Sequence, residues 1–157
     1  MTGSVTADPT TRATGSRHIG LALLALSAGG FAIGTTEFVT MGLLPQIADG
    51  IGVTIPKAGH VVSAYALGVV VGAPLIAALG ARLGRKRLLL GLMAVFAIGN
   101  LASAFASTYG ALMAARFLSG VPHGAFFGIG AVVGAAMVPP NRRARAGAVA
   151  LLMVELP

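Results

Sequence analysis

Two charged side chains lie inside long apolar stretches of this 157-residue chain: Glu37 within 19–44 and Arg116 within 110–138. A charge in the middle of a membrane helix costs about 2.5–3.5 kcal/mol on insertion scales, so it usually faces a partner or a cavity. His123 shares the second stretch and titrates near neutral pH, which suits a proton carrier. We therefore predict that Glu37, Arg116 and His123 lie on a pathway for a substrate or for protons.

Each of these residues also has a structural interpretation. Glu37 and Arg116 lie about 9–10 Å below the same end of their stretches, at 1.5 Å per helical residue. A purely structural ion pair between them is therefore geometrically possible, as is outward snorkelling of both side chains. His123 follows Pro122, and a neutral histidine can bond a carbonyl that proline leaves free. The sequence leaves these alternatives open.

The stretches that position these residues dominate the composition. Hydrophobic residues make up 56% of the chain and charged residues 10%, against roughly 25% charged residues in soluble domains. Because about 20 apolar residues cross a bilayer as a helix, we predict an all-α membrane protein with four complete transmembrane helices and the start of a fifth. Residues 1–17 form a polar leader and 18–157 a partial N-terminal bundle, with helices at about 19–44, 58–81, 88–107, 110–138 and, incomplete, 147–157.

The connections between the stretches predict the topology. Turn-forming residues, Pro45, Asp49-Gly50, Gly52 and Pro56 among them, favour a longer loop over 45–57. If the helices alternate, nine basic residues share one side and Lys57 stands alone on the other, so the positive-inside rule places the N-terminus in the cytoplasm of a multi-pass inner-membrane protein. The nine are Arg12, Arg17, Arg82, Arg85, Lys86, Arg87, Arg142, Arg143 and Arg145.

Several function classes are excluded by what the sequence lacks. The net charge is +7, and the basic residues lie in short clusters without interleaved aromatic residues, which argues against nucleic-acid binding. No cysteine is present, and neither H-E-x-x-H, a nucleophile elbow nor a Walker loop occurs. We therefore expect no enzyme activity, no metal and no cofactor.

Small and polar residues predict how the helices pack. Gly68-x-x-x-Gly72 and the run of glycines at 120, 124 and 128 follow the small-xxx-small pattern of close helix contacts. Asn100, Ser103 and Ser107 share a face of the third stretch and are expected to form helix–helix hydrogen bonds rather than to bind a ligand.

Four segments, in order, resemble a known family. The segment Ala81-Arg82-Leu83-Gly84-Arg85-Lys86-Arg87 resembles the cytoplasmic loop motif D-R-x-G-R-R/K of the major facilitator superfamily. Leu112-x-x-x-Arg116-x-x-x-Gly120-x-x-x-Gly124 is similar to a second motif of that family, which carries a membrane-embedded arginine. Segments 34–45 and 119–127 resemble the drug:proton antiporter branch, and arabinose and sugar efflux proteins most closely. The resemblance covers about 19–152.

This resemblance implies a fold and an activity. The family has twelve helices in two halves of inverted three-helix repeats, with the substrate bound between the halves. The implied activity is proton-coupled efflux of sugars, drugs or small metabolites across the lipid bilayer. By the same resemblance, Arg116 couples protonation to substrate release. Arg82, Gly84, Arg85 and Lys86 would form a cytoplasmic latch between the halves.

Two departures from the family pattern leave other functions open. Ala81 replaces the acidic residue of the loop motif, so the latch arginines lack their usual carboxylate. The sequence stops within the fifth stretch, from which we expect a truncated copy without its C-terminal half. Alternatives are a non-transporting membrane fragment, a half-transporter that needs a partner chain, and a small oligomeric channel.

Overall fold

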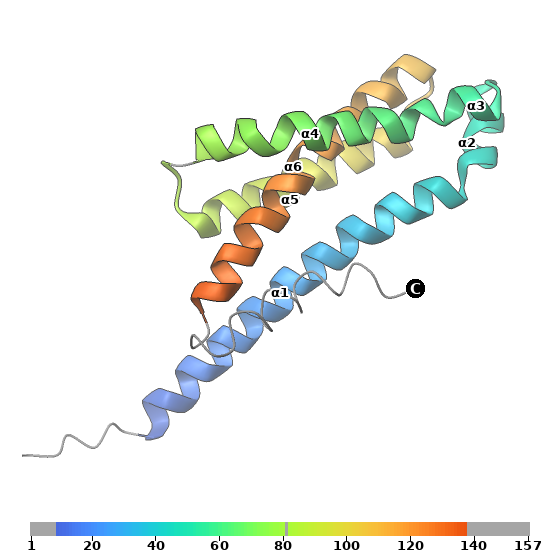
Figure 1. The fold of residues 1–157 in the computed structure, drawn as a ribbon. Coiled ribbons are helices and arrows are strands. Elements are labelled where there is room, and N and C mark those ends of the chain that lie inside the picture. Colours follow the sequence, from blue (N-terminus) through green and yellow to red (C-terminus); the bar gives the residue numbers. More distant parts are fainter. Residues whose placement is uncertain (1–8, 81, 138–157) are drawn as a thin grey trace, which may run out of the picture.

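The computed structural model describes residues 9–80 and 82–137, with side chains from residue 18 onward. These residues form six helices (Figure 1): α1 (Pro9–Gly42), α2 (Leu44–Ile51), α3 (Ile55–Ala58), α4 (His60–Gly80), α5 (Arg85–Ala104) and α6 (Tyr109–Ala136). Four segments are long and apolar enough to cross a membrane, namely His18–Gly42, Ile55–Gly80, Arg85–Ala104 and Tyr109–Ala136. The predicted all-α class with four complete spans is confirmed. The predicted fifth span and the basic turn at 142–145 lie outside the described residues.

The connection between the first two spans differs from the prediction. Most of the expected loop over 45–57 is helical, as α2 and α3. Pro45 and Pro56 lie in the first turns of these helices, where the missing N–H of proline costs no hydrogen bond. Gly52 ends α2 with a φ of 71°, a left-handed conformation that glycine adopts without strain. The turn-forming residues therefore mark helix ends rather than a continuous loop.

The third span also begins earlier than predicted. Gly84 has an extended backbone and caps α5, so Arg85, Lys86 and Arg87 form the first turn of the helix and not part of the preceding turn. Charged side chains at this position can reach water while the backbone continues its helical hydrogen bonds. The start predicted from the apolar residues, residue 88, is therefore three residues after the observed start of α5 at Arg85.

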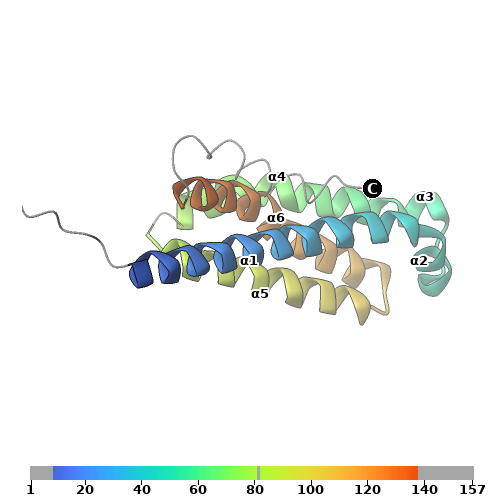
Figure 2. The ribbon, with the colours of Figure 1, turned by 90° about the horizontal axis from the view of Figure 1, so that it is seen from below.

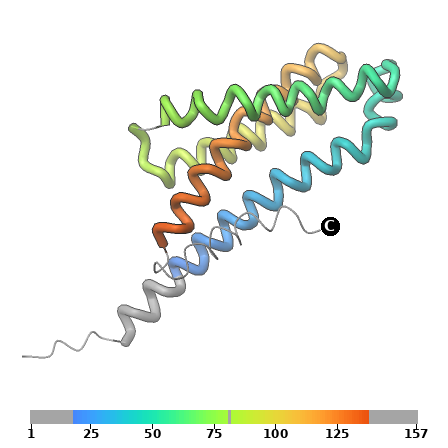
Figure 3. Tube along the Cα trace, in the orientation of Figure 1, coloured from blue at the N-terminus to red at the C-terminus, as the bar shows by residue number. Residues whose placement is uncertain are grey.

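The central helix of the described bundle is α6. It packs along both α4 and α5 and contacts α1 over a shorter stretch. Figure 2 shows α1 lying beside the group of α4, α5 and α6, and Figure 3 shows the chain running back and forth between two ends. We call them the α2–α3 end, which includes the turn from α5 to α6, and the α4–α5 end, which includes residues 82–84.

Glycines allow the helix backbones to approach. A Cβ on Gly72 of α4 would collide with the carbonyl oxygen of Val121 in α6. A Cβ on Gly99 of α5 would lie 2.8 Å from the Cβ of Ser119, also in α6. The small-xxx-small interpretation of 68–72 and 120–124 is therefore confirmed at the contact of α4 and α6.

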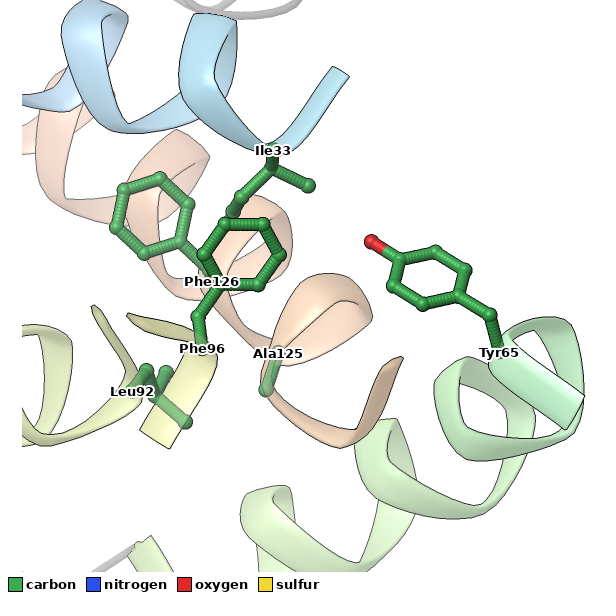
Figure 4. Close-up of a cluster of buried hydrophobic side chains, with 6 residues drawn as sticks. All are labelled: Ile33, Tyr65, Leu92, Phe96, Ala125 and Phe126. Carbon is green, nitrogen blue, oxygen red and sulfur yellow. The ribbon is translucent and has the colours of Figure 1, made fainter. Parts of the chain in front are cut away.

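A cluster of buried side chains joins the four long helices. Figure 4 shows its members, which come from α1, α4, α5 and α6: Ile33, Tyr65, Leu92, Phe96, Ala125 and Phe126. Many other large apolar side chains lie on the outside of the bundle, such as Leu24, Val70 and Phe105, at 65%, 70% and 79% exposed. An apolar exterior around an apolar core is the pattern expected when lipid surrounds the helices.

Candidate functional site

Five polar side chains converge between the four long helices, and we call them the polar cluster. One residue each comes from α1, α4 and α5, and two come from α6: Glu37, Tyr65, Asn100, Arg116 and His123. The cluster joins residues up to 86 positions apart in a chain whose spans are otherwise apolar.

Glu37 lies within ion-pair distance of His123 and not of Arg116. Oε2 of Glu37 lies 3.9 Å from Nδ1 of His123, and the side chains are 38% and 18% exposed, respectively. The Glu37–Arg116 pair, which equal depth along the helices made possible, is absent from the described residues, because α1 meets α6 on the far side of His123. Gly29 of α1 contacts Phe126 there.

Arg116 is buried at 4% exposure, so it does not snorkel outward. Its Cζ lies 4.5 Å from the ring centroid of Tyr65, and its Nη1 donates to Oδ1 of Asn100 at 3.4 Å. Its Nε is buried without a hydrogen-bond partner in the described structure. The guanidinium therefore contacts an aromatic face and an amide oxygen. A desolvated cation–π contact of this kind can stabilise the charge by about 2 kcal/mol.

Asn100 fulfils the packing role predicted for it. Besides accepting from Arg116, its Nδ2 donates to the carbonyl oxygen of Phe96 on its own helix at 2.8 Å. The amide thereby has a fixed orientation, because its donor side is held by the backbone of α5. The predicted helix–helix hydrogen bond of Asn100 is confirmed, and its partner Arg116 is a candidate site residue. The prediction is wrong for Ser103, whose hydroxyl donates to the carbonyl oxygen of Gly99 on its own helix.

His123 binds a side chain from another helix. Its Nδ1 lies 2.8 Å from the hydroxyl oxygen of Tyr65. This nitrogen therefore does not form the alternative hydrogen bond to a backbone carbonyl freed by Pro122. The ring of Phe127 packs at 5.1 Å from the imidazole. His123 therefore contacts Glu37 on one helix and Tyr65 on another.

Tyr65 is the member of the polar cluster that sequence reasoning missed. It lies in the stretch 58–81, which contains no charged residue, and tyrosine is common in apolar cores. One signal was present: Tyr65 lies three residues before Gly68, on the same helix face as the small-residue contact. That face packs on α6, where both Arg116 and His123 lie.

The loop-motif residues lie apart from the polar cluster, at the α4–α5 end. Arg82 lies in the turn, Gly84 caps α5, and Arg85 and Lys86 are exposed in its first turn. Arg85 is about 22 Å from Asn100 along the helix axis, at 1.5 Å per residue. Arg85 and Lys86 line one end of a groove of about 590 Å³ whose other walls are apolar side chains of α1, α5 and α6.

Metal coordination has no candidate among residues 18–80 and 82–137, where no three His, Cys, Asp or Glu side chains gather. The polar cluster offers a carboxylate, an imidazole, a phenol and a guanidinium instead. The imidazole can bind and release a proton, and the cluster as a whole can hold a polar or charged ligand.

Comparisons with known proteins agree with the motifs. The profile of the Major Facilitator Superfamily matches residues 26–156. The inner membrane transport protein YdhP of Escherichia coli K12 is 52% identical over 134 residues, which are 85% of this chain and 34% of that protein. The MFS-type transporter YtbD of Bacillus subtilis 168, described as uncharacterized, is 50% identical over 125 residues, or 80% and 32%.

A third relative carries a more specific name. The chloramphenicol resistance protein of Streptomyces lividans is 38% identical over 131 residues, which are 83% of this chain and 33% of that protein. The chain thus spans about a third of the length of the relatives it matches. With the family profile covering most of its residues, the chain belongs to the Major Facilitator Superfamily of membrane transporters.

Proposed function

We propose that the chain provides the proton-binding part of a secondary transporter that exports small molecules in exchange for protons. One observation carries the proposal. Glu37 and His123, whose Oε2 and Nδ1 lie 3.9 Å apart, have partly exposed side chains, whereas Arg116 is buried. Ionisable residues inside membrane helices commonly mark ion and substrate pathways. A merely structural pair would gain nothing from the exposure of Glu37.

Proton binding changes the attraction within this pair. When a proton binds the imidazole of His123, the resulting cation attracts the carboxylate of Glu37 strongly, because the surrounding dielectric is low. When the proton leaves toward the other side of the membrane, the imidazole is neutral and that attraction falls. Glu37 on α1 and His123 on α6 thereby make the contact between two helices depend on proton occupancy.

Arg116 is proposed to couple the proton to the exported molecule. Its guanidinium has no carboxylate within ion-pair distance among the described residues, and its Nε has no partner. A polar substrate group can bind this donor, and movement of the proton-binding pair can release it. The substrate class is sugars, drugs or small metabolites, which the name of the Streptomyces relative and the resemblance to sugar efflux proteins support.

The orientation and the latch are part of the same proposal. We propose that the α4–α5 end, and with it the N-terminus, lies in the cytoplasm of an inner-membrane protein, which the basic residues at 82–87 support. Arg82, Gly84, Arg85 and Lys86 then face the cytoplasmic boundary, where a latch to further helices would form. The name of the E. coli relative supports the inner membrane.

A second proposal concerns the helices that complete the pathway. The chain spans about a third of the length of its relatives, and the side chain of Glu37 on α1 is 38% exposed. We propose that further helices, on the same gene product or on a partner chain, close the substrate cavity over this face. Co-expression with the complementary two thirds of a close relative tests this directly, because restored transport from two inactive parts requires their association.

The test of the main proposal is proton movement in everted membrane vesicles that carry the complete gene product. Adding a transported substrate to acidified vesicles should raise their internal pH, as a pH-sensitive dye reports. Glu37→Gln and Arg116→Gln should each abolish this signal while membrane insertion, measured by immunoblot, is unchanged. Normal transport by both variants would overturn the proposal.

A further inference from the structure

We propose that Tyr65 is a positioning residue that connects the proton-binding pair to Arg116, a role that rests on the proposed function. Two contacts carry the inference. The hydroxyl of Tyr65 lies 2.8 Å from Nδ1 of His123, and its ring lies under the guanidinium of Arg116 at 4.5 Å. One rigid side chain thus touches both charged groups of α6.

The environment of Tyr65 favours a single position. The residue is 2% exposed, and Figure 4 shows its hydroxyl pointing from α4 toward α6. A Cβ on Gly120 would collide with the backbone carbonyl of Tyr65, so the two helix backbones are already in contact at this point. The ring therefore has little room to move unless α4 and α6 move with it.

When Nδ1 of the neutral imidazole carries the lone pair, the hydrogen bond between Tyr65 and His123 changes direction on protonation. A neutral imidazole with a free Nδ1 lone pair accepts the hydroxyl proton of Tyr65, whereas an imidazolium donates from both nitrogens. Tyr65 then has to accept from Nδ1, and its own proton turns toward another acceptor. No bond other than that to the carried proton is formed or broken.

The reorientation has a path to Arg116. The same ring that carries the hydroxyl supports the guanidinium, so a movement of α4 against α6 that accompanies the reorientation alters the cation–π contact and the donor geometry toward Asn100. The titratable groups that contact His123 are Glu37 from α1 and Tyr65 from α4, and Arg116 on its own helix contacts the ring of Tyr65. From α5 the neighbouring polar group is Asn100, which does not titrate.

The chain offers a clean test, because it has two tyrosines. Tyr65→Phe keeps the ring under Arg116 and removes the hydroxyl, whereas Tyr65→Leu removes both. Tyr109→Phe is the matched control, since its hydroxyl bonds His60 and the carbonyl of Lys57 at the α2–α3 end. Each variant is made in the complete gene product and assayed in vesicles both for proton-driven transport and for substrate exchange without net proton flux.

We expect Tyr65→Phe to lose about tenfold or more of the proton-driven rate, as loss of one well-placed hydrogen bond permits. Exchange should be nearly unchanged, because Arg116 keeps its aromatic support. Tyr65→Leu should lose both activities, and Tyr109→Phe neither. An equal loss of both activities in Tyr65→Phe would indicate a structural role and overturn the inference.

A second measurement avoids any folding defect. In the complete gene product, 3-fluorotyrosine is incorporated at position 65 alone through a reassigned stop codon, which keeps the ring and makes the phenol a stronger donor. The pH profile of proton-driven transport should shift, and an unchanged profile would overturn the inference. If the wild-type protein shows no proton-driven transport, the proposed function is contradicted. If the wild-type protein transports normally and Tyr65→Phe transports at the same rate, only the role of Tyr65 is contradicted.

Discussion

Gly68 of α4 and Gly120 of α6 meet where the two helices cross: an added Cβ on either glycine would lie 3.2 Å from the Cα of the other. Gly68 follows Tyr65 by three residues, and Gly120 follows Arg116 by four, so each polar residue lies one turn from the crossing. The contact between two glycines therefore fixes the height at which the ring of Tyr65 meets the guanidinium of Arg116.

Gly120→Ala should destabilise the bundle by about 1–3 kcal/mol, the usual effect of overpacking. The new methyl group would collide with the backbone carbonyl of Tyr65, which cannot rotate away. Gly128→Ala on the same helix is the control, because no atom lies within 4 Å of its added Cβ and alanine favours the helix. Thermal unfolding in detergent micelles measures both, and equal midpoints would contradict the packing described here.

Arg116→Lys should reduce transport about tenfold or more although it keeps the positive charge. A lysine ammonium lacks the planar face that stacks on Tyr65 and cannot reproduce the fixed donor geometry toward Asn100. The rate in everted vesicles measures the effect, with Arg87→Lys on the exposed first turn of α5 as the control. A fully active Arg116→Lys would mean that charge alone matters at this position.

Glu37→Gln should lower proton-driven transport about 100-fold, in the range expected for a residue that takes part in proton transfer. The amide keeps the shape of the side chain but cannot stabilise a protonated His123. Asp49→Asn is the control, because Asp49 is the other acidic residue among those described and lies exposed in α2. Transport that survives in Glu37→Gln and fails in Asp49→Asn would relocate the site to the α2–α3 end.

His123→Gln should flatten the pH dependence of transport. Between pH 5 and 8 histidine changes its charge, whereas glutamine retains hydrogen bonding to Tyr65 without titrating. Any residual transport by the variant is expected to be nearly constant over this range. A profile with the wild-type midpoint would assign the titrating group to another residue.

The orientation can be tested because the chain contains no cysteine. Leu83→Cys in the α4–α5 turn should react with a membrane-impermeant maleimide only from the cytoplasmic side, and Gly50→Cys in α2 only from the outside. Both positions are exposed at opposite ends of the bundle. The reverse labelling pattern would invert the topology.

The sequence by itself determined the parts of this protein that depend on local chemistry. The length of each apolar stretch predicted four spans, since a bilayer fixes how many residues a helix needs. The spacing of Gly68 and Gly72 predicted a close helix contact, because residues four apart share a helix face. The helical character of α2 was not predicted, since its eight residues are fewer than the window over which periodicity is read. The start of α5 at Arg85 was not predicted, since an apolar count does not include charged residues.

Only the tertiary structure decided which faces meet. Depth along a helix made Glu37 and Arg116 equal candidates for a pair, but the place where α1 contacts α6 brings Glu37 to His123. The same packing brings Tyr65 and Asn100 to Arg116 from two further helices. Sequence periodicity gives the rotation of each helix about its own axis, whereas crossing points depend on backbone contacts between helices far apart in the chain.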